Sequence, residues 1–320
     1  MRGEPAAVAS GRAAVDELVG LLDLAAVEPT GDPAVTDRLV PLAGVFAGRG
    51  AARGPARRYG GLIAAQALAA AGRTVRSGRP VHSLHAYFIR PGDSHRPVTY
   101  LVETLRDGRS MSTRRVVAVQ RETPIFFLTA SFHDPGSGLE HAQPPPEVPP
   151  PDEVPNLAQV LARAPGTLAA VEHMLFAFDA RYIGPPPWAQ KAGEARKAGE
   201  RAGDVPRRAW VRVAGKLPDD PLVHAGALTF ISDLPLLLSS MVAGHGQAWR
   251  PGDAGVSIDH TVWFHRPCRA DEWLLYDCRS PWAAGGRGLA TGGLYAMNGD
   301  LVATVAQEGL LLARPAQQAE

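Results

Sequence analysis

Asp233 is a single acidic residue inside an apolar stretch of the 320-residue chain, in the segment ALTFISDLPLLL. Apolar surroundings raise the pKa of a carboxyl group because burial disfavours its charged form, and a raised pKa makes the carboxylate a better general base. The pair Ser232-Asp233 before Leu234-Pro235 also fits a helix N-cap, since aspartate accepts from free N–H groups and proline suits a first helical turn. The residues alone leave both readings of Asp233 open.

Several histidines fall in strand-like segments, and a histidine paired with a carboxylate would suit a hydratase; they are His82, His85, His260 and His265. Asp259 and His260 are adjacent, so on a strand their side chains point to opposite faces and cannot both reach one substrate. A histidine that faces a core is more often a hydrogen-bonded structural residue. We therefore expect these histidines to be structural.

Other candidate groups give weaker signals. Four arginines either contact phosphate groups or decorate an exposed turn, and they are Arg106, Arg109, Arg114 and Arg115. The glycine-rich stretches AAGGRG and TGGLYA lack a strand-turn-helix context, so they predict strand kinks or bulges and no nucleotide loop. Cys268 and Cys278 have neither CxxC spacing nor a neighbouring Cys/His set, which predicts no disulfide framework and no metal site.

Charge and hydropathy exclude further classes. Lysine and arginine (33) almost balance aspartate and glutamate (32), so no overall field would recruit nucleic acid or an anionic membrane surface. The first residues lack the uninterrupted apolar core of a signal peptide, and no stretch reaches the roughly 20 apolar residues of a membrane span. We expect a cytoplasmic protein without a membrane span.

The elements that must position these groups follow the same order twice. Helix-like segments at 60–75 and 225–241 each come with four strand-like segments, at 81–89, 97–105, 112–120 and 124–132 and at 256–264, 272–280, 288–296 and 301–309. Short turns, including Asp107-Gly108 and Asn298-Gly299, predict antiparallel hairpins. A long helix with an antiparallel sheet, repeated, predicts an α+β fold in which each sheet wraps around a helix.

An internal repeat supports the duplication. At an offset of 176 residues, Tyr87-Phe88 aligns with Trp263-Phe264, Arg90-Pro91 with Arg266-Pro267, and Tyr100 with Tyr276. Between the halves, the proline-dense segment 144–155 predicts an extended linker, and the polar stretch 191–204 predicts a solvated insertion. We divide the chain into an N-terminal extension with a short helix (1–30), a first domain (31–138), a linker (139–157) and a second domain (158–315).

Six segments together resemble the acyl-CoA thioesterase II family: YGGLIAAQAL (59–68), HSLHAYFIRPGD (82–93), VETLRDGRSMSTRRVVAVQ (102–120), IFFLTASF (125–132), SIDHTVWFHRP (257–267) and VATVAQEGL (302–310). The resemblance implies a double hotdog, which is two fused hotdog domains, each an antiparallel sheet around a central helix. It also implies hydrolysis of fatty acyl-CoA to free acid and CoA, an acyl-CoA substrate, no cofactor, and a homo-oligomer.

The family's catalytic residues match Asp233, Ser257 and Gln307 of this chain. Many members have threonine where this chain has Ser257, which keeps the hydroxyl and loses the β-branch that restricts χ1. The resemblance implies that Asp233 accepts a proton from water, while Ser257 and Gln307 hydrogen-bond the water or the carboxylate. Backbone N–H groups at Gly60-Gly61, or near Asp233, would meet the oxyanion. The alternatives are a hotdog enoyl-CoA hydratase and a non-catalytic acyl-CoA-binding protein.

Overall fold

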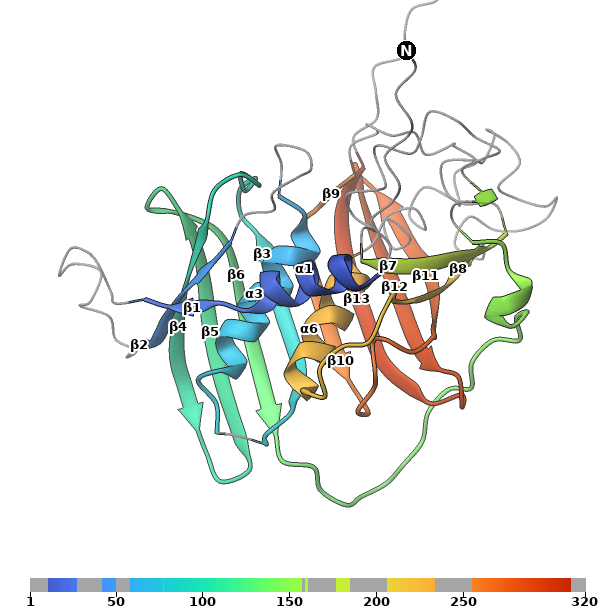
Figure 1. Cartoon of the computed structure of the whole chain (residues 1–320), viewed down its shortest axis with the longest axis horizontal. Coiled ribbons are helices and arrows are strands. Elements are labelled where there is room, and N and C mark those ends of the chain that lie inside the picture. The colour runs from blue at the N-terminus through green and yellow to red at the C-terminus, as the bar shows by residue number, and fades with distance from the viewer. Residues whose placement is uncertain are drawn as a thin grey trace, which may run out of the picture.

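One long antiparallel β-sheet organises the chain, with helices against one of its faces (Figure 1). The computed structural model describes residues 11–27, 42–49, 58–76, 78–156, 159–160, 177–184, 206–233 and 255–311. The helices are α1 (Arg12–Leu22), α3 (Gly60–Gly72) and α6 (Pro221–Ser232), and a short 3-10 helix, η1, spans Pro151–Glu153. This arrangement confirms the predicted double hotdog.

Both halves of the sequence contribute strands to this sheet. The first half contributes β1 (Ala25–Ala26), β2 (Leu42–Gly48), β3 (Val81–Phe88), β4 (Val98–Asp107), β5 (Met111–Gln120) and β6 (Thr123–His133). The second half contributes β7 (Phe178–Ile183), β8 (Arg207–Val213), β9 (Gly255–Ser257), β10 (Asp259–Phe264), β11 (Leu274–Ala284), β12 (Arg287–Ala296) and β13 (Leu301–Leu311). The order across the sheet is β1-β2-β4-β5-β6-β3-β10-β13-β12-β11-β8-β7, with β9 paired to β13 alone.

The two halves meet where β3 pairs with β10, and the register there follows the repeat offset of 176 residues. His85 lies opposite Thr261, its own repeat partner. Tyr87 pairs with Asp259, and their repeat partners, Trp263 and Ser83, pair with each other. A two-fold pseudosymmetry axis therefore passes through the β3–β10 pair, which confirms the duplication inferred from the sequence.

Helices α3 and α6 pack against each other on the inner face of the sheet. Small residues allow this close approach, because a Cβ on Gly72 would lie 2.5 Å from a methyl carbon of Leu222 and one on Gly61 would lie 2.7 Å from the Phe230 carbonyl oxygen. Helix α1 covers this pair with its apolar stripe, and Gln66 Nε2 donates to the Leu21 carbonyl oxygen at 2.7 Å. The predicted N-terminal helix is thus part of the core.

The start of α6 differs from the prediction. The helix begins at Pro221 instead of Ala225, and the exposed Asp220 caps it by accepting from the Leu222 backbone N–H at 2.9 Å. An aspartate followed by proline is itself a helix-start signal, which the apolar pattern alone overlooked. Asp233 occupies the position directly after the last residue of α6, so it follows this helix. The remainder of the predicted helix, 234–241, lies outside the described residues, and so does the insertion 191–204.

The connection between the halves, residues 134–156, packs on the outer face of the second half (Figure 1), and its proline-dense part, 144–155, is extended as predicted except at the 3-10 helix η1. We call the whole connection the strap. Trp210 Nε1 donates to the Pro149 carbonyl oxygen at 2.9 Å, and Arg181 Nη1 donates to that of Pro151 at 2.6 Å. Val154 is buried in a cluster with Trp210, Leu275 and Tyr295. The strap therefore adds a small second core to this face of the sheet.

Of the two glycine-rich stretches, AAGGRG differs from the prediction, whereas TGGLYA lies in β12 where the pairing with β13 has a register shift between Leu294 and Tyr295, in line with the predicted bulge. Gly285 and Gly286 both have positive φ and form the turn between β11 and β12, so AAGGRG is a tight hairpin turn and no kink. Gly292 in TGGLYA lies within β12, where a Cβ would meet the Tyr276 ring at 2.5 Å. Gly299 has a positive φ in the turn between β12 and β13, as the Asn-Gly signal predicted.

Candidate active site

Asp233 lies where the end of α6 meets the start of α3, and 5% of its surface is exposed. Its Oδ1 accepts a hydrogen bond from Gln307 Nε2 at 2.5 Å and a longer one from Ser257 Oγ at 3.4 Å. The backbone N–H of Gly61 also donates to this carboxylate. Of the residues proposed from the sequence, Gln307 and Ser257 therefore both hydrogen-bond Asp233.

Neighbouring strands carry the two polar partners of Asp233. Gln307 is fully buried on β13, and its Oε1 has no hydrogen-bond partner among the described residues. Ser257 ends β9, which pairs with β13 so that Ser257 lies opposite Gly309. The strand is then interrupted at Ile258, whose N–H donates to the Glu308 carbonyl oxygen at 2.9 Å. This break between β9 and β10 turns Ser257 towards the end of α6.

The electrostatic setting of Asp233 raises the pKa of its carboxyl group to about 6. Burial is the main cause, because the charged form loses its water shell. The hydrogen bonds from Gln307, Gly61 and Ser257 act in the opposite direction, since each stabilises the carboxylate. A carboxyl group with this pKa is largely ionised at neutral pH and remains a stronger base than an exposed aspartate.

Gly60 lets this carboxylate approach the first turn of α3. A Cβ at position 60 would lie 2.7 Å from Asp233 Oδ2 and 2.8 Å from the ring of Phe88. Both distances are below van der Waals contact, so only glycine fits without a shift of its neighbours. The N-terminal end of α3 thus faces the carboxylate directly, and its positive dipole end favours negative charge there.

Side chains from outside α6 hold its last turn, a role that was not predicted for them. Tyr59 donates its hydroxyl to the Phe230 carbonyl oxygen at 3.0 Å, and Tyr276 donates to that of Ser232 at 2.7 Å. The Ser232 hydroxyl donates to the Thr229 carbonyl oxygen at 2.9 Å and lies 2.8 Å from His260 Nε2. The repeat pair Tyr100 and Tyr276 was the available signal, because it places a tyrosine at the same point in each half.

The histidines are structural, as expected. His260 is completely buried, and burial lowers its pKa to about 3, so its ring is neutral. Asp259 Oδ1 accepts from the Glu308 backbone N–H at 2.7 Å, away from His260. The exposed-face rings contact hydroxyl groups, His82 with Ser131 and His265 with Thr304, both at 2.8 Å. Asp259 and His260 therefore do not form a catalytic pair.

Two of the four arginines, Arg114 and Arg115, depart from both readings offered for the cluster. Arg114 is buried and donates to Asp107 Oδ2 at 2.9 Å and to the Thr74 hydroxyl at 2.9 Å. Arg115 pairs with the buried Glu103 at 2.5 Å. Both guanidinium groups are already paired with carboxylates of the first half. They therefore stabilise the first half of the sheet. Arg106 and Arg109 are exposed, as a solvated turn requires.

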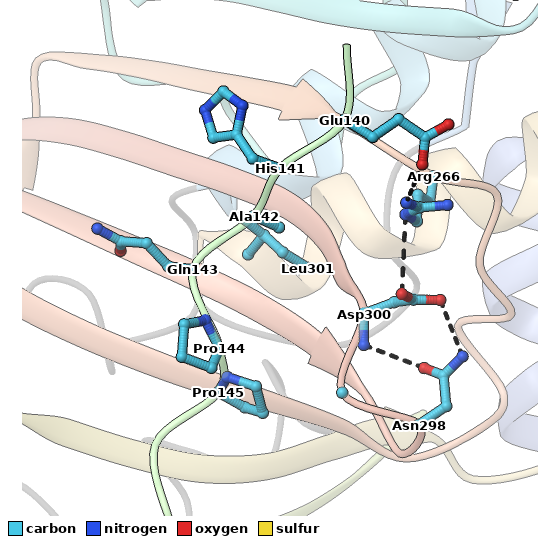
Figure 2. A pocket seen from close by; sticks show the side chains of 11 residues that line it. Glu140, His141, Ala142, Gln143, Pro144, Pro145, Arg266, Asn298, Asp300 and Leu301 are labelled. Atoms are coloured by element: carbon cyan, nitrogen blue, oxygen red, sulfur yellow. Dashed lines mark hydrogen bonds and ion pairs between the residues drawn. The ribbon is translucent and has the colours of Figure 1, made fainter. Parts of the chain in front are cut away.

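A surface hollow of about 510 Å³ lies away from Asp233, between the strap and the β12–β13 turn (Figure 2). Arg266 bridges Glu140 of the strap, at 3.2 Å, and Asp300, at 3.7 Å. These charged side chains are largely exposed, so water screens them and the ion pairs are weak. The hollow lies where the strap contacts the β12–β13 turn, and the ion pairs that line it provide no catalytic group.

Within the described residues, no helix combines the length and apolar character needed to cross a membrane. Likewise, the described part of the chain contains no cluster of His, Cys, Asp and Glu side chains suited to a metal ion.

Comparison with known families gives two matches along the chain. Residues 47–133 match the acyl-CoA thioesterase N-terminal domain, and residues 187–310 match a model described as acyl-CoA thioesterase. The first match contains α3 and strands β3 to β6. The second contains Asp233, Ser257 and Gln307.

Individual relatives cover most of the chain. Human acyl-coenzyme A thioesterase 8 is 38% identical over 82% of this chain and 82% of its own length. Acyl-CoA thioesterase 2 of Haemophilus influenzae is 33% identical over 83% of this chain and 92% of its own. Among solved structures, an acyl-CoA thioesterase II, TesB2, of Mycobacterium marinum superposes with a TM-score of 0.71 at 36% identity, covering 93% of this chain and 99% of that one.

Proposed function

The chain belongs to the acyl-CoA thioesterase family of thioester hydrolases, and from that premise we propose that it cleaves fatty acyl-CoA to free acid and CoA with a water activated by Asp233. The observation that carries the proposal is the buried Asp233 carboxylate, with a pKa near 6, bonded to Gln307 and Ser257. Thioester hydrolysis needs an activated water and a site for the oxyanion, whereas a thiolate leaves readily.

Asp233 is the proton acceptor in this proposal. A water that donates a hydrogen bond to its carboxylate transfers a proton to it as the oxygen attacks the thioester carbonyl carbon. The proton then passes to the departing thiolate or to solvent, and Asp233 returns to its ionised form. A pKa near 6 suits this cycle, because the group is ionised at neutral pH and still binds a proton appreciably.

Gln307 and Ser257 orient the pair of water and carboxylate. Gln307 donates through Nε2 to Asp233, and its buried Oε1, without a partner among the described residues, is an acceptor for one hydrogen of that water. Ser257 is 3.4 Å from Asp233 Oδ1, a long hydrogen bond that leaves its hydroxyl able to contact the water as well. Fixed positions for the reacting groups remove much of the entropic barrier to attack.

The start of α3 is the candidate site for the developing oxyanion. Amides in the first turn of a helix have no acceptor within that helix, and Gly61 already donates to Asp233. Gly60 presents backbone without a side chain beside the carboxylate. The end of α6 is a poorer candidate, because the C-terminal end of a helix carries the negative end of its dipole.

The alternatives differ in which residue they require. An enoyl-CoA hydratase would need an essential histidine near the carboxylate, but the nearest strand histidine, His260, is neutral, buried and bonded to Ser232. A non-catalytic acyl-CoA-binding protein would have no need for a buried carboxylate with a raised pKa. Both alternatives predict that the wild type releases no CoA thiol, because neither cleaves the thioester bond.

We also propose that copies of the chain associate through the outer face of the sheet. Aromatic side chains are exposed there on central strands, with Tyr87 at 48%, Phe127 at 38% and Trp263 at 37%. The sequence-based expectation of a cytoplasmic enzyme stays a prediction. Light scattering on the purified protein measures the association, and a monomer would contradict it.

Release of free CoA from a panel of acyl-CoAs, for the wild type and for Asp233→Asn, tests the proposed function. Asparagine keeps the shape of the side chain and removes the base, so CoA release should fall at least about 100-fold. Asp259→Asn is the matched control, because Asp259 is a second carboxylate close by in the fold and should keep activity. No CoA release by the wild type, or full activity of Asp233→Asn, would contradict the proposal.

A further inference from the structure

Side-chain hydroxyl groups bind the last carbonyl oxygens of α6. A helix leaves its last carbonyl groups without internal partners, and burial of such groups without a donor is costly. Here Thr229, Phe230 and Ser232 each have their carbonyl oxygen bound by a side-chain hydroxyl, from Ser232, Tyr59 and Tyr276 respectively. The turn that carries Asp233 is therefore fixed by α3, by β11 and by its own serine.

Ser232, the residue directly before Asp233, is held through both its backbone and its side chain. Tyr276 on β11 donates to its carbonyl oxygen at 2.7 Å. Its hydroxyl has a single hydrogen, which goes to the Thr229 carbonyl oxygen, so the same oxygen accepts from His260 Nε2 at 2.8 Å. The His260 ring is neutral with its proton on Nε2, in agreement with a pKa lowered to about 3. We call Tyr276, His260 and Ser232 the Ser232 clamp.

The first half of the chain has the same tyrosine without the clamp. Tyr100 is the repeat partner of Tyr276 and is equally buried, but its hydroxyl donates to Gln66 Oε1 at 2.7 Å, in the middle of α3. Ala130 occupies the position in the first half that Gln307 has in the second. Gln307 lies opposite Ala290 and Ala130 lies opposite Arg114, and Arg114 and Ala290 are repeat partners. In the half without this glutamine, the tyrosine therefore holds the middle of its helix, whereas the helix end is held by Thr74, whose hydroxyl donates to the Ala71 carbonyl oxygen at 2.8 Å.

We propose that Tyr276 and His260 are positioning residues for hydrolysis: by holding Ser232 they fix the direction in which the Asp233 carboxylate points. This inference rests on the proposed role of Asp233 as the base. Neither side chain contacts the reacting atoms. They act through the peptide unit that joins Ser232 to Asp233, which has few remaining ways to rotate once its carbonyl oxygen and the preceding hydroxyl are both bound.

Loss of the clamp lets the last turn of α6 pivot, and the Asp233 carboxylate then moves relative to Gln307 and Ser257. The hydrogen bond from Gln307, now 2.5 Å long, opposes the effect of burial on the Asp233 pKa. A weaker bond raises that pKa further and misplaces the base. The other titratable groups near the carboxylate, Tyr59 and Tyr276, stay neutral because burial raises their pKa values well above the usual range.

Tyr276→Phe tests the inference, with Tyr100→Phe as the matched control. Each substitution removes one buried hydroxyl at the same repeat position and keeps the ring. We expect Tyr276→Phe to lower kcat about 10- to 100-fold, because a displacement of about 1 Å in catalytic groups costs that much. KM should stay unchanged, and the acid limb of the kcat profile should move to higher pH. Tyr100→Phe should lower the melting temperature similarly and keep kcat and the pH profile.

Equal kcat losses in the two variants, or no loss in Tyr276→Phe, would overturn the inference. A second pair of variants tests it independently of Tyr276. His260→Gln keeps an N–H donor for the Ser232 hydroxyl, so it should retain most of kcat. His260→Leu removes this donor, so its kcat should fall as in Tyr276→Phe. Equal rates for these two variants would also count against the clamp.

Asp233→Asn distinguishes this inference from the proposed function. If Asp233→Asn keeps full activity, the role of Asp233 as base is wrong. If Asp233→Asn is slow while Tyr276→Phe and His260→Leu match the wild type, only the clamp is wrong.

Discussion

Replacement of Asp233 by asparagine should raise the stability of the protein relative to the wild type as the pH increases from acidic to neutral values. The carboxyl pKa is about 6 in the folded chain, against 3.8 for an unperturbed aspartate. Below the lower value the group is protonated in both states and contributes nothing. As the pH rises from 3.8 to 6, the unfolded chain releases its proton while the folded chain keeps it, so the wild type loses stability with increasing pH.

The size of this loss follows from the pKa difference. A difference of about two units corresponds to about 3 kcal/mol, of which about 2 kcal/mol develops between pH 4.5 and pH 8. Asparagine does not titrate, so the variant lacks this loss. Any constant cost, such as its amide facing the Gly61 N–H, cancels when the two pH values are compared. For a chain of this length, about 2 kcal/mol corresponds to a shift in melting temperature of about 3 °C.

Thermal unfolding of the wild type and Asp233→Asn in matched buffers at the two pH values measures this effect. The melting temperature of the variant relative to the wild type should rise by about 3 °C from the acidic to the alkaline buffer. Asp220→Asn is the control at the other end of α6, because asparagine also caps helices. A difference between variant and wild type that does not change with pH would refute the reasoning that Asp233 titrates in a dry site.

Three further outcomes follow from the same geometry. The kcat of the wild type should fall as the pH drops through about 6, and Gln307→Leu should move that midpoint up by about one to two units, because a hydrogen bond to a charged group is lost. Gly60→Ala should lower kcat about 100-fold in steady-state assays while the chain stays folded, because its Cβ would lie 2.7 Å from Asp233 Oδ2. Trp210→Phe removes the 2.9 Å bond to Pro149 in the strap, so protease cleavage of the strap should accelerate and stability should fall by about 1 kcal/mol with kcat unchanged.

The sequence predicted the fold well where hydrophobic alternation and turn residues agree. Strands β3 to β6 match their predicted ranges within two residues at each end, because alternating apolar residues and the Asp107-Gly108 turn specify both their faces and their register. The repeat predicted two equivalent halves, whereas the pairing of β3 with β10, through which the halves meet, came from the structure. Strands β2, β7 and β8 were missed, because they are short and separated from the repeated block.

The site was predictable only in part. Asp233, Ser257 and Gln307 came from the resemblance, because no local pattern reveals that residues 24 and 74 positions from Asp233 meet it in space. The pKa of Asp233 could be foreseen in direction from its apolar surroundings. The hydrogen bonds of Tyr276 and His260 to Ser232 could not be foreseen, because they depend on where the end of α6 meets two strands that follow it in the chain.

Single turnover in water enriched in oxygen-18 tests most directly whether a water activated by Asp233 attacks the thioester. Excess enzyme is mixed with acyl-CoA, and the free acid from the first turnover is analysed by mass spectrometry. Direct attack by water predicts one oxygen-18 atom in that acid and none in the protein. An unlabelled acid from the first turnover, with oxygen-18 incorporated into Asp233, would show that the carboxylate itself attacks and would contradict the account.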